Sequence, residues 1–391
     1  MSGQPLYFAP SNFKNMRYYI IAGEPSGDLQ GAALVRALRQ ADPSAEIRCW
    51  GGDLMAAAGA KTVKHYRELA FMGFVEVVKN LPTILRNFRF AKTDIQAFSP
   101  DCLILIDYPG FNLRMAKWAK SQALKVFYYI SPQLWAWHTS RVKIIRDCVE
   151  RMFVIFPFEK DFYKKHGVEV SFIGHPLAAV IERHIAPADF LQKNGLDSKP
   201  FIALLPGSRR QEVERMLATM LEVTTYFPDY QFVVAKAASL DLDFYKFFLE
   251  KYPSVKLVDN QTYDLLKNAH AALVTSGTAT LETALFRVPQ VVCYKAGNVS
   301  YQLAKRLVNK DLRFISIVNL IANDKVVEEL IQADFTTEKT VAALREILAP
   351  ANRKLIQENY EKLRQLLGPT NCAELAAEEI LQYLASTRPN P

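Results

Sequence analysis

The feature that most constrains the fold of this chain is an alternation of short apolar runs with helical patterns, which occurs in two series. In the first series the strand-like runs are Arg17–Ala22, Glu46–Trp50, Cys102–Asp107, Val126–Ile130, Met152–Phe156 and Val170–Ile173. In the second series they are Phe201–Leu205, Gln231–Ala235, Val255–Val258, Ala271–Thr275 and Gln290–Tyr294. Strands that are apolar almost throughout and are joined by helices predict parallel sheets covered on both faces.

Two such series in tandem predict an α/β fold of two doubly wound, Rossmann-like domains facing a cleft, followed by C-terminal helices. The length of 391 residues agrees, because a single hydrophobic core stops growing at about 250–300 residues. We expect residues 1–15 to be a disordered extension, 16–190 the N-terminal domain, 200–365 the C-terminal domain and 370–391 a final helix. Ligands of such sheets bind beyond the carboxyl ends of the strands, so the loops there should carry the chemistry.

The composition narrows the class of protein. A net charge of +8 favours anionic partners such as nucleotides, phosphorylated substrates or anionic lipid surfaces. The five cysteines are scattered without a CxxC pair, which favours reduced thiols in the cytoplasm over a disulfide framework or a zinc site. No run of about 18 apolar residues is present, so no membrane-spanning helix is expected. No histidine cluster has the spacing of metal ligands, and we predict neither a metal site nor a cofactor.

Two loops of the second series suit a nucleotide diphosphate. In "LLPGSRRQEVER", Gly207 allows a tight turn and Ser208 offers a hydroxyl. Arg209 or Arg210 offers a guanidinium that can hold a phosphate through two hydrogen bonds. The alternative is that Ser208 caps the following helix and the arginines are solvated.

The second of these loops is "LVTSGTATLETALF", in which Ser276, Gly277 and Thr278 place small side chains at the positive end of a helix. Glu282 follows about a turn later, either to hold ribose hydroxyls or as a surface residue. The chain has neither GxGxxG nor GxxxxGK[ST], so neither NAD binding nor ATP hydrolysis is indicated.

Two loops of the first series suit a sugar and a proton transfer. "CLILIDYPGFN" puts Asp107 at the end of a buried strand, where an acid is costly unless it is hydrogen-bonded or functional. Asn112 is its expected support and a sugar contact, whereas a turn-forming or capping Asp107 is the alternative. "YYISPQLWAW" places Ser131 and Gln133 among aromatic side chains that either face a sugar or simply pack.

The stretch "IAGEPSGDLQGA" is a glycine-flanked strand-to-helix turn that carries Glu24 and Asp28. Glycines at such a turn usually suggest a phosphate cradle. Two carboxylates would repel a diphosphate, however, and would instead accept hydrogen bonds from hydroxyls. We therefore expect Ser26, Gly27 and the two acids to contact a sugar.

A basic amphipathic segment lies at 71–92, "FMGFVEVVKNLPTILRNFRFAK". Its apolar residues predict one broad face, and the interspersed cations are Lys79, Arg86, Arg89 and Lys92. Such a segment lies on an anionic membrane or clasps an acyl chain, unless it is a domain helix packed on the sheet.

Ten stretches between Ile21 and Ala322, taken in order, resemble the lipid-A-disaccharide synthase family. They are "IAGEPSGDLQGA", "MGFVEV", "IDYPGFN", "ISPQLWAWHTSRV", "PFEKDFY", "FIGHPL", "LLPGSRRQEV", "SGTATLE", "AKRLV" and "IVNLIA". Each stretch is modest alone, but the ordered set is specific. The chain departs from the family at Gly110, where many members carry an acid, and in the polar positions of "SPQLWAWHTSR".

The resemblance implies a GT-B fold with an acceptor-binding N-terminal domain, a UDP-sugar-binding C-terminal domain and a last helix that packs back on the first domain. It implies an inverting, metal-independent transfer of 2,3-diacylglucosamine from UDP to the 6-hydroxyl of 2,3-diacylglucosamine 1-phosphate. The products are the β-1,6-linked lipid A disaccharide 1-phosphate and UDP. It also implies a cytoplasmic protein, peripheral through 71–92 on the inner face of a Gram-negative inner membrane. An oligomer is compatible with it, and no nucleic acid beyond the UDP moiety is implied.

An inverting displacement needs a base beside the acceptor hydroxyl and positive charge on the departing diphosphate. Asp107 is the candidate base, with Glu24 and Asp28 as rivals. Arg209 and the N–H groups at 276–278 are expected on the diphosphate and Glu282 on the ribose. Asn319, in "IVNLIA", is carried over from the resemblance as a donor-side residue.

Two other classes of function remain open from the residues. One is a different sugar-nucleotide enzyme, such as a UDP-N-acetylglucosamine 2-epimerase or the peptidoglycan-precursor glycosyltransferase. The other is a non-catalytic nucleotide- or RNA-binding protein, although the basic residues are dispersed and no RNA-binding motif is present.

Overall fold

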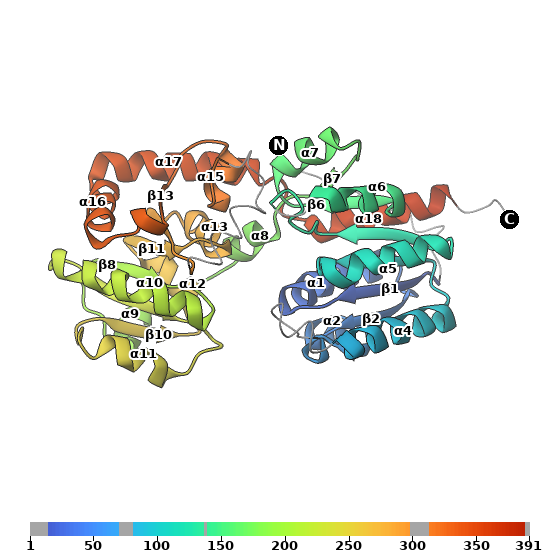
Figure 1. The fold of residues 1–391 in the computed structure, drawn as a ribbon, viewed down its shortest axis with the longest axis horizontal. Coiled ribbons are helices and arrows are strands. Elements are labelled where there is room, and N and C mark those ends of the chain that lie inside the picture. Colours follow the sequence, from blue (N-terminus) through green and yellow to red (C-terminus); the bar gives the residue numbers. More distant parts are fainter. Residues whose placement is uncertain (1–14, 70–80, 137–138, 298–312, 388–391) are drawn as a thin grey trace. The chain divides into compact units, whose positions relative to one another are not determined.

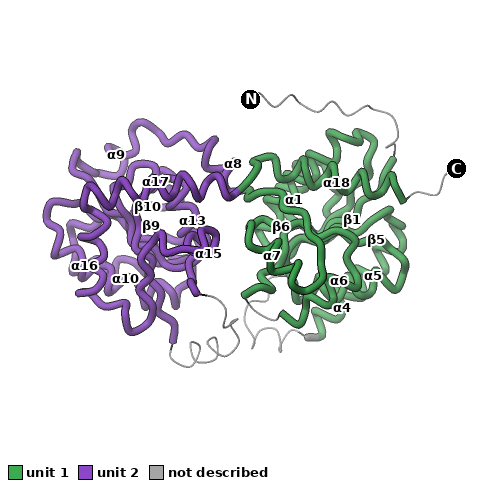
Figure 2. The backbone as a smooth tube through the Cα atoms, turned by 90° about the horizontal axis from the view of Figure 1, so that it is seen from above, with its two compact units in different colours: residues 1–176, 368–391 green, residues 177–367 purple. Residues whose placement is uncertain are grey.

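The computed structural model describes residues 15–69, 81–136, 139–297 and 313–387. The chain divides into two compact units, and Figure 2 shows unit 1 (residues 1–176 and 368–391) in green and unit 2 (residues 177–367) in purple. Each unit is built on one parallel β-sheet covered by helices (Figure 1). The predicted class of two doubly wound α/β domains followed by C-terminal helices is confirmed.

The sheet of unit 1 has the strand order β3-β2-β1-β4-β5-β6-β7. Its strands are β1 (Arg17–Ala22), β2 (Glu46–Gly51), β3 (Lys61–His65), β4 (Cys102–Ile106), β5 (Lys125–Tyr129), β6 (Arg151–Val154) and β7 (Ser171–Phe172). The sequence missed β3, since "KTVKH" is polar and lies at an edge, where only β2 pairs with it.

Helices cover both faces of this sheet because the side chains of successive strand residues point to opposite faces and pack in two separate cores. Tyr18 of β1 packs with α1 (Pro25–Ala41), α2 (Asp53–Ala57) and α18 (Cys372–Ser386), whereas Tyr19 packs on the other side. The helices of that second face are α4 (Leu81–Phe98), α5 (Pro109–Ser121), α6 (Val142–Cys148) and α7 (Pro157–Lys165).

The last helix, α18, belongs to unit 1 and packs against α1. The chain returns to unit 1 at Gly368, close to the point where it leaves. A Cβ on Gly174 would lie 2.0 Å from the carbonyl oxygen of Pro369, so glycine is required for this close approach.

The sheet of unit 2 has the strand order β10-β9-β8-β11-β12-β13. Its strands are β8 (Phe201–Leu205), β9 (Gln231–Lys236), β10 (Lys256–Asp259), β11 (Ala271–Thr275), β12 (Gln290–Tyr294) and β13 (Glu328–Ile331). The sequence missed β13, whose residues "EELI" are half polar and occupy the other edge of the sheet.

The helices of unit 2 likewise form two layers. The core on one face includes α10 (Arg210–Val223), α11 (Leu242–Leu249) and α16 (Thr337–Leu348). The core on the other includes α9 (Phe190–Lys193) and α12 (Thr262–Asn268). The remaining helices are α8 (Pro176–Glu182), α13 (Thr278–Leu285), α15 (Ile317–Ala322) and α17 (Pro350–Leu366).

The boundary between the units differs from the predicted one. The first domain was expected to extend to residue 190, but residues 177–190 belong to unit 2. There His184 accepts or donates a 2.8 Å hydrogen bond with Asp264, and Phe190 is buried in the core beside α12. Residues 177–190 therefore pack on unit 2 and are not the end of the first domain. Most of the predicted extension, residues 1–14, lies outside the described residues.

The amphipathic segment 71–92 is described only from residue 81, where α4 begins. The predicted single apolar face divides there, since Leu85 is exposed whereas the ring of Phe88 packs edge-on against Phe111. The described helices include none with the length and apolar character needed to cross a membrane. All five cysteines are buried free thiols.

Candidate active site

In each sheet the strand order reverses beside the first strand of the unit. In unit 1, β1 lies between β2 and β4, and in unit 2, β8 lies between β9 and β11. The loops at the carboxyl ends of these strands flank the point at which doubly wound sheets bind ligands. Glu24 and Asp107 follow β1 and β4, and Arg209 and Ser276 follow β8 and β11. Four of the five loops that the sequence singled out are thus brought together in two pairs, one in each unit.

The loop at Asp107 holds a strained backbone. Asp107 and Tyr108 have φ of 42° and 48°, and among the described non-glycine residues no other neighbours both have positive φ. This conformation costs about 1–2 kcal/mol per residue. The Tyr128 hydroxyl donates to the carbonyl oxygen of Asp107 at 2.6 Å, and Asn112 Nδ2 lies 2.9 Å from that oxygen and 3.1 Å from the carbonyl oxygen of Ile106. These bonds hold the loop in place.

The environment of Asp107 suits a base. Burial, assisted by the negative charge of Glu24, raises the pKa of Asp107 to about 6, against an opposing hydrogen bond from the Tyr108 backbone. A carboxylate with a pKa close to the working pH combines availability with basicity. Glu24 is half-buried at the N-cap of α1, and its side chain makes no hydrogen bond with the described residues.

The glycines of "AGEPSGD" have packing roles. A Cβ on Gly23 would lie 2.4 Å from Cγ of Tyr108, and one on Gly27 would lie 3.1 Å from Cβ of Ala22. Gly23 therefore admits the Tyr108 ring, and Gly27 lets α1 approach β1. Ser26 is exposed in the first turn of α1.

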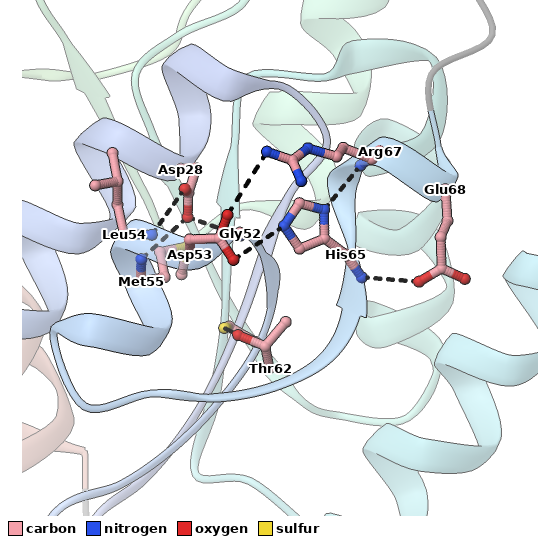
Figure 3. A network of polar contacts seen from close by, with 10 residues as sticks. Asp28, Gly52, Asp53, Leu54, Met55, Thr62, His65, Arg67 and Glu68 are labelled. Carbon is pink, nitrogen blue, oxygen red and sulfur yellow. Dashed lines mark hydrogen bonds and ion pairs between the residues drawn. The ribbon is translucent and has the colours of Figure 1, made fainter.

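Asp28 has a structural role, which corrects its prediction as a rival base. Figure 3 shows its carboxylate receiving three backbone N–H groups: Oδ1 accepts from Gly52 at 2.7 Å and Met55 at 3.1 Å, and Oδ2 accepts from Leu54 at 3.1 Å. Asp28 is only 2% exposed and satisfies the N-terminus of α2. Its lone pairs are occupied, so it has little capacity left for a proton or a sugar.

Two predicted sugar contacts are also occupied inside unit 1. Asn112 is fully buried and supports the Asp107 loop rather than facing a ligand. Ser131 is buried, and its hydroxyl lies 2.7 Å from that of Tyr163. Burial raises the pKa of the neighbouring Glu159 to about 8. Gln133, by contrast, is exposed.

The Gly207 loop of unit 2 is closed by an acid of its own helix. Glu212 Oε2 accepts the backbone N–H groups of Ser208 at 3.0 Å and Arg209 at 3.2 Å, and Oε1 pairs with the Arg209 guanidinium at 3.1 Å. Gly207 has φ of 116°, and a Cβ there would lie 2.7 Å from that of Glu212. The Arg209 side chain is exposed but pairs with Glu212, and the Ser208 and Arg209 N–H groups already hold the same carboxylate.

The loop after β11 is open. Gly277 and Thr278 are exposed at the start of α13, and a Cβ on Gly277 would meet no atom within 4 Å. The Ser276 hydroxyl donates to the carbonyl oxygen of Ile315 at 3.3 Å. No described residue thus lies over Gly277, and the positive end of a helix is a place that suits an anion.

Glu282 lies on α13 beside an aromatic cluster. Its Oε1 accepts a hydrogen bond from the Tyr263 hydroxyl at 2.9 Å, and burial raises the pKa of Glu282 although this bond opposes the rise. The Tyr263 ring packs against His184 and Phe286. The Tyr263 hydroxyl therefore orients Oε1, whereas Oε2 accepts no hydrogen bond from the described residues.

Asn319 is enclosed, which corrects its prediction as a UDP-sugar contact. It is fully buried; Nδ2 donates to the carbonyl oxygen of Val327 and to Glu329 Oε1, and Oδ1 accepts from the backbone of Val326 and Val327. Glu329 also accepts the Ser316 N–H at 2.9 Å. Asn319 therefore ties α15 to β13 below the Ser276 loop.

Comparison with known proteins connects this geometry to a family. The sequence profile of a family described as "Lipid-A-disaccharide synthetase" matches residues 18–381. The chain belongs to the lipid-A-disaccharide synthase family. A lipid-A-disaccharide synthase from Geobacter metallireducens is 40% identical over 381 residues, which cover 96% of this chain and 99% of that protein. One from Coxiella burnetii is 38% identical over 378 residues, covering 95% and 100%.

Solved structures of sugar-nucleotide enzymes share the fold. The UDP-GlcNAc 2-epimerase from Neisseria meningitidis bound to UDP-GlcNAc has a TM-score of 0.63 at 13% identity, covering 94% of this chain and all of that one. The glycotransferase of kitacinnamycin has a TM-score of 0.63 at 15% identity, covering 95% and 99%. At these identities the likeness shows the fold alone, the GT-B fold of glycosyltransferases, as the sequence predicted.

The structure also shows residues of the site that the motifs did not indicate. Tyr128, Glu212, Tyr263 and Glu329 organise the four loops but were not singled out. Glu212 had a usable signal, because an acid three residues after a helix N-cap is typical of a capping box. The other three act across 10 to 21 residues of chain, which no local pattern encodes. The described residues contain no group of three or more His, Cys, Asp or Glu placed to hold a metal ion.

Proposed function

We propose that this protein transfers 2,3-diacylglucosamine from UDP to the 6-hydroxyl of 2,3-diacylglucosamine 1-phosphate, with inversion. The products are the β-1,6-linked lipid A disaccharide 1-phosphate and UDP. The family match over residues 18–381 carries the proposal. Asp107, whose pKa is raised by burial, and the exposed start of α13 in unit 2 agree with it.

In this proposal Asp107 of unit 1 is the base. It takes the proton of the acceptor hydroxyl as the oxygen attacks the anomeric carbon of the donor. With a pKa of about 6, it is mostly ionised at neutral pH and can still accept a proton readily. Glu24 keeps that pKa raised and is placed to orient a sugar hydroxyl.

Unit 2 binds the UDP moiety. The Arg209 guanidinium and the N–H groups at Gly277 and Thr278 neutralise the diphosphate as it leaves. Glu282 accepts hydrogen bonds from the ribose hydroxyls through the oxygen that Tyr263 does not use. The Glu212 carboxylate shapes the loop and keeps a second anion away from the Ser208 and Arg209 N–H groups.

We further propose that the protein is peripheral on the inner face of a Gram-negative inner membrane. On α4, Leu85 and Phe90 are exposed beside the exposed Arg86 and Arg89, which suits an anionic lipid surface. Replacing both arginines by alanine should reduce co-sedimentation with vesicles that contain anionic lipid. Unchanged binding would assign α4 to another role.

The test of the reaction is UDP release from UDP-2,3-diacylglucosamine with and without 2,3-diacylglucosamine 1-phosphate. We expect release only when the lipid monosaccharide phosphate is present, with a disaccharide as the second product. A change in the sugar nucleotide without the acceptor would instead indicate an isomerase. Salt-sensitive RNA binding without any UDP release would indicate a nucleic-acid-binding protein.

A further inference from the structure

A pocket with a cationic lining lies in unit 1 between α5 and α6, outside the residues given a role so far. Its volume is about 220 Å³. Arg114 and Lys117 of α5 and Arg141, just before α6, supply the charges, and Leu113 and Ile144 supply apolar surface. Pockets for drug-sized ligands span about 300–1,000 Å³, so this one suits a small charged group with one apolar edge and not a whole lipid.

The three cations lack acidic partners. Among the described residues none of Arg114, Lys117 and Arg141 forms an ion pair, whereas the neighbouring Lys120 and Arg146 pair with Glu150 and Asp147. Arg141 is half-buried, so its charge is partly removed from water without a protein anion to balance it. Such a cluster is arranged to receive an anion from outside.

The pocket adjoins the Asp107 loop. Pro109 and Gly110, the first two residues of α5, form part of its wall and follow Asp107 by two and three positions. The charge of Arg141 also reaches Tyr128. Burial and the Asp107 charge raise the pKa of Tyr128, and the charge of Arg141 opposes that rise. Tyr128 is the residue that donates to the Asp107 carbonyl oxygen. An anion held here would therefore lie against the residues that directly follow the base in the chain.

We propose that this pocket binds the 1-phosphate of the sugar acceptor and so positions the acceptor hydroxyl at Asp107. The inference rests on the proposed function, which supplies an acceptor with a phosphomonoester. The phosphate and the reacting hydroxyl belong to one sugar ring, so fixing the phosphate fixes the hydroxyl. Guanidinium groups bind phosphate through paired, charge-assisted hydrogen bonds, and the helix dipole of α5 adds to the attraction.

The decisive experiment compares the acceptor with its dephosphorylated form, using UDP release as the readout. Wild type should show a kcat/KM for the phosphorylated acceptor about 10- to 100-fold higher. In Arg141→Ala, and in Arg114→Ala with Lys117→Ala, this ratio should fall toward one, mainly through KM. Arg146→Ala, which removes a paired cation of α6 outside the pocket, should keep the wild-type ratio.

Lys117→Glu gives a variant that reverses the charge of one pocket cation without disturbing packing. Lys117 is exposed and forms no ion pair with the described residues, so the Tm should stay close to that of wild type. The preference for the phosphorylated acceptor should fall in this variant. An unchanged preference in Lys117→Glu and Arg141→Ala, with both folded, would overturn the inference.

A direct binding measurement separates this inference from the proposed reaction. Glucosamine 1-phosphate should bind wild type, as measured by calorimetry or NMR titration, at least about tenfold more tightly than it binds Lys117→Glu. Inorganic phosphate should bind more weakly than the sugar phosphate, and anionic vesicles should not compete with it. Absent UDP release together with this binding pattern would refute the reaction alone. UDP release without it would refute the subsite alone.

Discussion

Asp28 and Asp107 are two acids at the carboxyl end of the same sheet. Their surroundings differ in the number of backbone N–H groups that each carboxylate accepts. Asp28 receives three backbone N–H groups and is 2% exposed. Asp107 receives one backbone bond, lies near the charge of Glu24 and has a pKa raised to about 6. N–H groups stabilise the charged form and hold it in a fixed role, whereas burial without them leaves the acid ready for a proton.

Two acids of unit 2, Glu212 and Glu282, differ in the same way. Glu212 accepts two backbone N–H groups and an arginine, so it serves the loop. Glu282 accepts one tyrosine hydroxyl and keeps an oxygen for a ligand. In both units the number of protein donors that an acid already holds separates structural from functional carboxylates. The following predictions test this distinction, from the largest effect to the smallest.

Replacing Asp107 by asparagine should lower kcat by about 10²- to 10⁴-fold, because the base is lost while the size of the side chain is kept. UDP affinity, measured by calorimetry, should stay close to wild type since unit 2 is untouched. A kcat within threefold of wild type would remove Asp107 as the base and reopen the role of Glu24.

Replacing Asp28 by asparagine should lower the free energy of unfolding by about 2–4 kcal/mol, because one amide oxygen cannot serve three buried N–H groups. Denaturant titration measures this. Asp53→Asn is the matched control, since Asp53 is an exposed neighbour with long ion pairs of 3.6 and 3.7 Å to His65 and Arg67 (Figure 3). It should cost less than about 1 kcal/mol. Equal losses in the two variants would contradict the structural role of Asp28.

The pH dependence should show opposite signs for activity and stability. The base must be ionised, so kcat/KM should fall about tenfold per pH unit below pH 6. The folded protein binds this proton more tightly than the unfolded chain, whose Asp has its ordinary pKa of 3.8. Its contribution to stability is therefore complete below pH 3.8 and is lost as the pH rises through about 6.

Glu24→Gln sharpens the pH prediction. Without the charge of Glu24, the pKa of Asp107 should fall, so the acid limb of the kcat/KM profile should move to lower pH. Asp107→Asn should abolish the corresponding stability change between pH 3.8 and 6. An acid limb that does not move in Glu24→Gln would show that another group controls it.

Removing the hydroxyl of Tyr263 should have the smallest effect. Tyr263→Phe leaves Glu282 without its orienting donor and should weaken binding of UDP by about 3- to 10-fold. The effect should be absent in Glu282→Gln with Tyr263→Phe relative to Glu282→Gln alone, because the hydroxyl acts through that carboxylate. Tyr226→Phe, at an exposed tyrosine of unit 2, serves as the control for loss of a hydroxyl.

Much of the fold could be predicted from the sequence, because buried parallel strands are locally apolar. The bounds of β1, β8, β11 and β12 agree with the predicted runs at both ends. The edge strands β3 and β13 were missed, since half-exposed strands keep polar residues and lose the apolar signal. The boundary at residue 177 was missed because residues 177–190 join unit 2 through contacts such as that of His184 with Asp264, which lie far apart in the chain.

The sequence by itself determined the two α/β domains, the family and the four loops that hold the candidate site, because apolar periodicity and ordered motifs are local properties. The tertiary structure decided which acids in those loops are free. The carboxylate of Asp28 is occupied by backbone N–H groups of residues 52–55. Asn112 and Tyr128 bind the carbonyl oxygen of Asp107 and not its carboxylate. Hydrogen-bond saturation depends on groups that meet only after folding, and no spacing of residues records it.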